Sequence, residues 1–392
     1  MTTQRNPHRF RLEIVAFAVF GGLTGYRPAL GEPVFMGLGD FPGGTSMSRA
    51  NAVSADGSTV VGASRSATGR EAFRWTFEEG MIGLGDLPGG DFESEARDVS
   101  ADGSVIVGRS DSASGSYGEA FRWEGGVMTG LGDLSGGSFS SEARAVSADG
   151  SFIVGSGISE AGTEAFLWNA ATGMVGLGDL PGGQFQSQAR GVSDDASVVV
   201  GTGQTGIGEV AAFRWTESTG MVGLGYLPGP GGLSSATGVS SDGSVVFGYS
   251  DSDEGTQAFR WSAETGMEAL GSFGPLAMSE DGTVMVGSIS SSQAVIWDEV
   301  NGIRDLEDLL EVDFGLDLSD WTLLSARDIS ADGTVIVGLG INPQGYKEGW
   351  VAVIPEPSCL TLFILCAWAL PKGSRQKAFR CRHKRSLKEV MS

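Results

Sequence analysis

The sequence between residues 34 and 354 repeats one arrangement of apolar and polar positions. Short β-rich segments alternate with clusters of Gly, Ser, Asp and Pro, and none of them has the 3.6-residue apolar period of a helix. In one copy these segments are "ARDVS" (96–100), "VIVG" (105–108), "EAFRW" (119–123) and "VMTGLG" (127–132). The run at 105–107 is apolar without alternation, as in a strand covered on both faces. The pattern predicts four short β-strands in each copy.

The copies follow one another at a nearly constant spacing. An aspartate in the turn after the first strand marks each of them: Asp56, Asp102, Asp149, Asp195, Asp242, Asp281 and Asp332. These aspartates lie 46, 47, 46, 47, 39 and 51 residues apart. A period of this length matches one four-stranded β-propeller blade. The sequence therefore predicts an all-β fold, a seven-bladed β-propeller of four-stranded blades over residues 32–354.

The two ends of the repeated region complement each other. It opens with "VFMGLGD" (34–40), a fourth strand without the first three, and closes with "GWVAVI" (349–354), a third strand without a fourth. We expect the two fragments to form one blade, so that the N-terminal strand closes the ring and no sheet edge stays free. Within "EAFRW", Phe121 and Trp123 share one face and are expected to pack against the neighbouring blade.

The recurring Asp-Gly stretch has two interpretations, a row of carboxylate sites or a repeated backbone turn. Asp-Gly between apolar strands is a strong hairpin signal, because Gly103 allows positive φ and Asp102 can accept a backbone hydrogen bond. We expect this turn to join the innermost strand to the second strand on one face. The Pro-Gly-Gly loops and the Ser/Gly-rich loops then lie on the opposite face, the better candidate for binding.

Acidic loops on that second face are the candidate binding residues. Four aspartates begin inter-blade loops, and they could form a ring for cations or sugar hydroxyls or accept backbone N–H groups within the turn. They are Asp40, Asp86, Asp133 and Asp179. In "SDSDEGT" (250–256), Asp251 and Asp253 have the spacing that begins a calcium loop, but the distal bidentate Glu is missing. No cofactor is expected beyond this calcium candidate; the alternative is a solvated acidic loop.

One stretch breaks the repeat most strongly. "RDLEDLLEVDFGLDLSDWTLL" (304–324) replaces an inter-blade loop, has a short helical pattern from Leu306 to Leu310, and contains Trp321 outside the strand register. It could be a helical cap over the central channel or an insertion that binds a partner or ligand.

Composition removes several kinds of chemistry from residues 32–354. The chain has two histidines, His8 and His383, and three cysteines in its last tenth, so Ser-His-Asp catalysis, Cys-His catalysis and imidazole zinc sites are excluded there. The same region holds 14 basic and 45 acidic residues, a net charge of −31. We expect it to repel nucleic acid and anionic lipid head groups.

Both ends of the chain have the pattern of addressing segments. Residues 1–31 combine arginines, the apolar stretch 14–23 and a small-residue cleavage site, which predicts a secretory signal peptide. Residues 355–392 begin with Pro355, Glu356 and Pro357, continue with the apolar segment 359–370 and end in a basic tail. This order resembles the PEP-CTERM sorting signal of Gram-negative bacteria. The resemblance implies an exosortase-type enzyme as a partner. Twelve apolar residues span about 18 Å as a helix, against about 30 Å of hydrocarbon, so we expect transient membrane association.

The repeat itself resembles a family of bacterial extracellular repeats named for a His-Ala-Phe tripeptide. Its companion motifs stand here as "GLGDLPGG" (83–90 and 176–183) and "GLGDLSGG" (130–137). The histidine position of the tripeptide holds Glu71, Glu119, Glu164 and Gln257. The resemblance implies a secreted or surface β-repeat protein and brings no catalytic residues with it.

These observations lead to two functional expectations. The first is a non-catalytic protein, secreted or on the outer surface of a Gram-negative-type bacterium, that binds extracellular polysaccharide or another surface protein in the matrix or cell envelope. The second is a carboxylate-based carbohydrate-active enzyme on a propeller fold, since paired carboxylates could be present among 45 acidic residues.

Overall fold

The computed structural model describes residues 32–206, 208–318 and 320–354. The predicted signal peptide (1–31) lies outside these residues. So does the predicted sorting signal (355–392), with Pro355, Glu356, Pro357 and the apolar segment 359–370. Among the described residues, no helix is long and apolar enough to cross a membrane.

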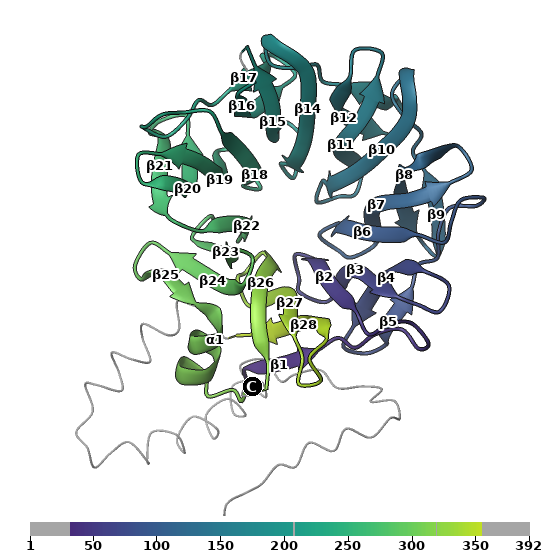
Figure 1. Cartoon of the computed structure of the whole chain (residues 1–392), viewed down its shortest axis with the longest axis vertical. Helices are drawn as coiled ribbons and strands as arrows, with labels where there is room; N and C mark the ends of the chain where they lie inside the picture. The colour runs from purple at the N-terminus through teal and green to yellow at the C-terminus, as the bar shows by residue number, and fades with distance from the viewer. Residues whose placement is uncertain (1–31, 207, 319, 355–392) are drawn as a thin grey trace, which may run out of the picture.

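The fold is all-β and resembles a β-propeller, with antiparallel sheets arranged around a common centre (Figure 1). In each repeat, the strands pair in chain order. The first two four-stranded sheets are β2 (Ser48–Val53), β3 (Val60–Arg65), β4 (Arg70–Thr76), β5 (Gly80–Gly83), and β6 (Ser94–Val99), β7 (Val105–Ser112), β8 (Gly115–Glu124), β9 (Val127–Gly130).

The next two repeats are joined by a single parallel pair, Thr163 with Gln186, into one eight-stranded sheet. Its strands are β10 (Gly136–Val146), β11 (Phe152–Ser159), β12 (Thr163–Asn169), β13 (Gly173–Gly176), β14 (Gly182–Val192), β15 (Val199–Thr205), β16 (Val210–Thr216) and β17 (Gly220–Gly223). Two more four-stranded sheets follow: β18 (Ser234–Val239), β19 (Val245–Ser252), β20 (Gly255–Ser262), β21 (Gly266–Gly271), and β22 (Gly274–Met278), β23 (Val284–Ile289), β24 (Gln293–Asp298), β25 (Gly302–Asp305).

The remaining sheet combines both ends of the described chain. Its order is β1 (Val34–Gly37), β28 (Lys347–Val353), β27 (Val335–Ile341) and β26 (Thr322–Ile329). β1 runs antiparallel to β28, with Val34 opposite Val353 and Gly37 opposite Trp350. The expected pairing of the two fragments is therefore present.

Apolar side chains fill the spaces between neighbouring sheets. Phe121 is fully buried in a cluster with Val61 and Ala72 of the preceding sheet, and Trp123 packs against the same cluster. The expected packing of this strand face against a neighbouring repeat is confirmed, and the neighbour is the preceding one. The apolar core is thus divided into separate clusters, each lying between neighbouring sheets.

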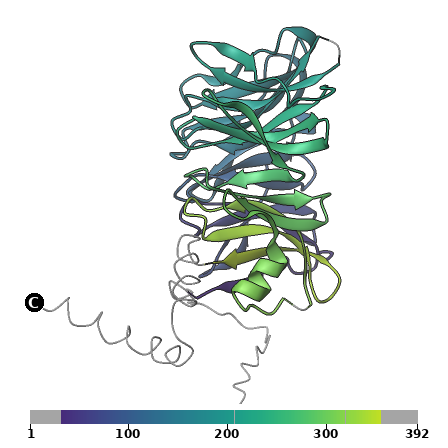
Figure 2. The same cartoon turned by 90° about the vertical axis from the view of Figure 1, so that its left-hand side faces the viewer.

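The two kinds of loop lie on opposite faces of the flattened molecule, which Figure 2 shows from the side. The Asp-Gly turns of successive repeats touch: the backbone N–H of Ala101 donates to the carbonyl of Ala148, 3.0 Å away. The Pro-Gly-Gly loops instead meet the loops between second and third strands, where the N–H of Ala113 donates to the carbonyl of Pro88 at 3.2 Å.

The repeat-breaking stretch forms the helical turn α1 (Leu306–Asp308) and a π-helical segment (Leu309–Asp313). Asp305 caps α1 by accepting from the N–H of Glu307 at 2.8 Å. This stretch lies beside β25 and β26 at the outer rim in Figure 1, and its leucines share a cluster with Ile296 and Trp350. The expected cap over the central channel is therefore wrong, because burial of these leucines requires the apolar gap between the last two sheets. The helical pattern from Leu306 is confirmed.

Candidate functional site

A β-bulge recurs in the first strand of every repeat. In β6, Ala96 lies opposite Gly108 and Asp98 opposite Val107, so Arg97 has no partner across the ladder. A bulge turns the extra residue away from its regular direction. The glycine is required at this point, because a Cβ on Gly108 would lie 2.0 Å from the carbonyl oxygen of Glu95. The residues skipped in this way are Asn51, Arg97, Arg144, Arg190, Thr237, Leu276 and Arg327.

The same seven residues line a central cavity of about 190 Å³. The first strands are therefore the innermost strands, as expected, and the bulges direct their side chains inward. Four of the seven are arginines, although the chain as a whole carries a net charge of −22. The described residues that line the channel include four guanidinium groups and no carboxylate. We call these seven residues the channel site.

Two glutamates beside the channel hold some of these arginines by ion pairs. Glu142 pairs with Arg97 and, at 2.8 Å, with Arg144. Glu95 pairs with Arg49 and lies 3.2 Å from the guanidinium of Arg70. Burial opposes ionisation of Glu95, but Arg97, Arg49 and Arg70 together lower the pKa of its carboxyl. Both glutamates therefore act as fixed counter-ions.

The other two channel arginines are held differently. Arg327 donates to the amide oxygen of Asn51 at 3.3 Å, and the Asn51 amide group donates to the carbonyl of Ala96 at 2.7 Å. Arg190 forms no ion pair with any of the described residues. Carboxylates thus neutralise Arg97 and Arg144 on one part of the channel wall and leave the charges of Arg190 and Arg327 without a counter-ion among the described residues.

The arginines also repel one another. Burial lowers the pKa of the Arg144 guanidinium, and the nearby Arg190 and Arg97 act in the same direction while Glu142 opposes them. Burial likewise lowers the pKa of Arg327, with Arg49 and Arg97 acting in the same direction. Several cations therefore share a partly desolvated space, an arrangement that favours an incoming anion.

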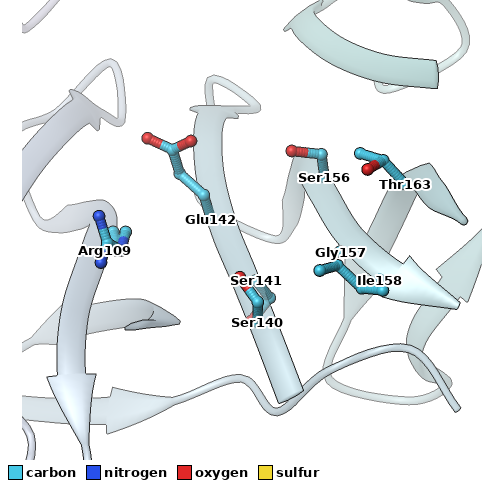
Figure 3. Close-up of a pocket in the computed structure, with 8 residues that line it drawn as sticks. All are labelled: Arg109, Ser140, Ser141, Glu142, Ser156, Gly157, Ile158 and Thr163. Atoms are coloured by element: carbon cyan, nitrogen blue, oxygen red, sulfur yellow. The ribbon is translucent and has the colours of Figure 1, made fainter. Parts of the chain in front are cut away.

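A polar pocket of about 190 Å³ adjoins the channel and shares Glu142 with its ion-pair network. In Figure 3, Arg109 from one sheet faces Glu142 across the pocket, and Ser156 and Thr163 stand on the far side of Glu142. The remaining lining residues are Ser140, Ser141, Gly157 and Ile158. The pocket provides hydroxyl groups and a guanidinium group near the channel mouth.

The turn aspartates stabilise the backbone of the turns in which they lie. Asp102 accepts from the N–H of Ser104 at 2.9 Å and from the hydroxyl of Ser100 at 2.8 Å, while Gly103 has φ of +73°. Hydrogen bonds from Ser104 and Ser100 lower the pKa of its carboxyl. The turn interpretation is the one that this geometry supports.

Two aspartates of the inter-blade loops also accept hydrogen bonds from backbone N–H groups. Asp133 accepts from the N–H of Ser140 at 2.7 Å, and Asp179 from the N–H of Gln186 at 2.7 Å. Burial raises the pKa of Asp40 and of Asp86. Asp133 and Asp179 thus accept backbone N–H groups within their loops, as one of the two alternatives predicted.

The calcium candidate has internal partners as well. Asp251 accepts from the hydroxyl of Thr256 at 2.8 Å, and the backbone N–H of Asp253 donates to the carbonyl of Pro228 at 3.1 Å. Over the described part of the chain, no three His, Cys, Asp or Glu side chains are grouped so that they could hold a metal ion.

The glutamates at the histidine position of the repeat motif hold the following loop. Glu119 accepts from the backbone N–H of Gly132 at 3.0 Å. Glu71 and Glu164 make the equivalent bond to Gly85 and Gly178. Gln257 instead bonds Ser252 and Glu254. These residues position the Gly-Leu-Gly-Asp segment between repeats.

Sequence reasoning missed the channel site. The dipeptide Ala-Arg recurs before the Asp-Gly turn, at Arg97, Arg144, Arg190 and Arg327, and that repetition was the available signal. The bulge that turns these arginines into the channel depends on pairing with the next strand. A strand examined alone does not show it.

Comparisons with known proteins find solved structures of similar fold but no matching protein family. No family model matches the chain, and no curated protein matches it. Among solved structures, TolB from Acinetobacter baumannii has a TM-score of 0.44 and 11% identity over 79% of this chain. The chain spans 64% of that protein's length. Oligogalacturonate lyase from Vibrio parahaemolyticus has a TM-score of 0.49 and 12% identity, covering 84% of this chain and 99% of that one. The computationally designed Ika8 protein has a TM-score of 0.41 and 18% identity, over 74% of this chain and 80% of the designed one.

Proposed function

We propose that this chain is a non-catalytic repeat protein that binds an extracellular ligand through its central channel. The protein would be secreted or displayed on the surface of a Gram-negative-type bacterium, in the exopolysaccharide matrix or cell envelope. The observation that carries the proposal is the channel site, where bulges from seven strands bring four guanidinium groups together. Such donors suit recognition of polar and anionic groups.

In the proposed architecture, the repeats are seven blades and the N-terminal strand closes the ring. Three contacts between the ends of the repeated region support it. β1 pairs with β28, the hydroxyl of Ser48 accepts from the N–H of Gly349 at 3.1 Å, and Asp328 accepts from the N–H of Val53 at 2.7 Å. A closed ring holds the channel-lining strands at fixed distances from one another.

Binding is favoured over glycoside hydrolysis by the state of the channel carboxylates. A hydrolase of this kind needs one carboxyl whose pKa is raised, so that it can donate a proton to the leaving group. Arg97, Arg49 and Arg70 instead lower the pKa of Glu95 against the effect of burial, and Glu142 is ion-paired to Arg97 and Arg144. Neither glutamate is prepared to act as an acid. Asp98 and Asp328, whose pKa values are raised, accept hydrogen bonds from backbone N–H groups of neighbouring sheets.

The proposal includes a route to the cell surface. The segment from Pro355 to Pro357 and the apolar residues 359–370 would be read by an exosortase-type enzyme after export, with transient membrane association. Expression of the chain with Pro355 and Pro357 both changed to Ala tests this step. We expect loss of correct surface sorting, measured by fractionation; unchanged fractionation would contradict the sorting role.

A glycan array combined with a hydrolysis panel tests the binding function. The purified full-length chain is expected to bind at least one class of extracellular glycan on the array. Incubation with the same glycans is expected to release no shortened sugars by mass spectrometry. A Glu142→Gln variant, checked for folding by circular dichroism, serves as control. Sugar release that disappears in this variant would favour the enzyme alternative instead.

A further inference from the structure

The charges around the channel do not balance. Four guanidinium groups line the channel, and two carboxylates lie beside them. Glu95 and Glu142 pair with Arg97 and Arg144 and also with Arg49 and Arg70, which are not part of the lining. Neither Arg190 nor Arg327 has a carboxylate partner among the described residues. The carboxyls of Asp98 and Asp328 do not fill this role, because they bond backbone N–H groups of neighbouring sheets.

The imbalance at Arg190 arises from a substitution between repeats. In β6 and β10, the residue two positions before the channel arginine is Glu95 or Glu142, and in β14 the same position holds Gln188. The fourth repeat thus keeps the arginine without its counter-ion. The adjacent strand β18 contributes the neutral Thr237 to the same cavity.

Several guanidinium donors around the channel have no acceptor among the described residues. The Nε atoms of Arg97, Arg144, Arg190 and Arg327 are shielded from solvent and donate no hydrogen bond within the described structure. Buried donors of this kind cost free energy until an acceptor reaches them. A planar guanidinium pairs with carboxylate, sulfate or phosphate through two parallel hydrogen bonds.

We propose that the channel binds an oxyanion between Arg144 and Arg190, with the hydroxyl of Thr237 beside it. This inference deepens the proposed function. It rests on that function only where the anion is the acidic group of a saccharide. The cavity of about 190 Å³ is smaller than pockets for drug-sized ligands, which begin at about 300 Å³. It therefore accepts one charged group, either a free inorganic anion or the acidic group of a sugar residue at a chain end.

Isothermal titration calorimetry with the purified full-length chain tests the proposal. Three ligands are compared at constant ionic strength: sodium sulfate, a glucuronate oligosaccharide and a neutral glucose oligosaccharide. Arg190→Gln removes the charge at the arginine that has no ion pair, so that no carboxylate is left unpaired. Arg214→Gln, in β16 of the same repeat but outside the channel, is the matched control. Circular dichroism and the thermal midpoint establish that both variants fold.

We expect an anion to bind the wild type, with affinity reduced at least tenfold, roughly, by Arg190→Gln and unchanged by Arg214→Gln. Arg190→Lys should restore part of the affinity, because it keeps the charge and loses the planar fork. Sulfate binding without saccharide binding would identify a free anion as the ligand.

Two results would overturn the oxyanion site. One is failure of both sulfate and glucuronate to bind; the other is anion binding that Arg190→Gln leaves unchanged. Binding of the neutral oligosaccharide with no effect of Arg190→Gln would leave the glycan-binding function standing without this site. Arg190-dependent sulfate binding, together with no binding to any glycan, would support the site and contradict the matrix role.

Discussion

At the scale of single residues, Ala196 occupies a backbone position that glycine holds in the other Asp-Gly turns. Its φ is +57°, in the left-handed region that residues with a Cβ adopt at a cost. The equivalent glycines are Gly57, Gly103, Gly150, Gly243, Gly282 and Gly333, with φ from +70° to +74°. The fourth repeat keeps the turn because Asp195 still accepts from the N–H of Ser197 at 2.9 Å.

We expect Ala196→Gly to stabilise the protein by about 0.5–1 kcal/mol. Relief of the left-handed strain exceeds the entropy that glycine adds to the unfolded chain. The matched change Gly103→Ala should destabilise it, because φ is +73° and the new Cβ would lie 2.5 Å from the hydroxyl oxygen of Thr59. Urea unfolding followed by tryptophan fluorescence measures both; a loss of stability in Ala196→Gly would contradict this account.

Two partly buried aspartates, Asp98 and Asp328, directly follow the channel arginines Arg97 and Arg327 and have raised pKa values. Burial raises the pKa of Asp98 to about 6, and burial together with the nearby Asp98 raises the pKa of Asp328 to about 8. In the unfolded chain both return to the ordinary value of 3.8. The stability that protonated Asp328 contributes is therefore complete below about pH 4 and is lost as pH rises through 8.

We expect Asp328→Asn to remove this pH dependence. Between about pH 4 and pH 8, the wild type should lose stability relative to the variant as pH rises, by at most about 1.4 kcal/mol per pH unit, since the folded state binds the proton more tightly. Urea unfolding at several pH values measures the difference. Asp102→Asn is a control of opposite sign, because the pKa of Asp102 is lowered and its contribution is lost in acid. A difference between wild type and Asp328→Asn that stays constant with pH would contradict the raised pKa.

At the scale of strands and helices, a serine at the inner edge of several sheets ties one repeat to the next. The hydroxyl of Ser94 donates to the carbonyl of Gly85 at 2.6 Å and accepts from the N–H of Ala72 at 2.9 Å. Ser141, Ser187 and Ser234 make the same two bonds, one repeat further along each time. At the junction between the last two sheets, the leucines of 306–318 fill the gap instead.

The helical insertion is expected to act as a structural wedge between those sheets. Leu310 is fully buried, whereas Val312, two residues later, is 78% exposed. Leu310→Ala should therefore cost about 2–5 kcal/mol, and Val312→Ala should change stability by less than about 0.5 kcal/mol. Chemical denaturation measures both. Calorimetric anion affinity should be equal in the two variants, and a weaker affinity in Val312→Ala would instead indicate a ligand-binding insertion.

At the scale of the whole molecule, the two ends of the repeated region meet in one sheet. Phe35 of β1 packs edge-to-face on Trp321, with ring centroids 5.3 Å apart, and also lies 5.9 Å from the ring of Trp350. Trp321, which the repeat did not account for, thus holds the N-terminal strand against the last sheet. Without β1, the edge of β28 would expose unpaired backbone groups.

Deletion of residues 34–40 is expected to lower the thermal midpoint by at least about 5 °C. The deletion removes the β1 pairing together with Phe35 and the buried Leu38. Phe35→Ala alone should cost about 2 kcal/mol, because the ring is half-buried. Met36→Ala, on the exposed face of the same strand, is the control and should have little effect. An unchanged midpoint after the deletion would mean that the pairing of β1 with β28 does not stabilise the protein.

The repeat period, the four strands per repeat, the Asp-Gly turns and the complementary end strands could all be predicted from the sequence. Each depends on local properties: apolar runs of strand length, and a turn that needs glycine where φ is positive. The pairing of residues 34–37 with 350–353 followed from counting strands. These features can be predicted from the sequence because every repeat forms its strands and turns from the same local residue pattern.

Only the tertiary structure decided where the arginines and the insertion lie. Arg97 and its equivalents turn inward because their strands bulge against the second strand, and a bulge is a property of two paired strands. The leucines of 306–318 lie at the rim because the gap that buries them exists once two complete sheets stand side by side. The sequence determined the repeated strands and turns of this protein. Only the tertiary structure brought the skipped residues of the first strands together to line one cavity, which no single repeat marks as a site.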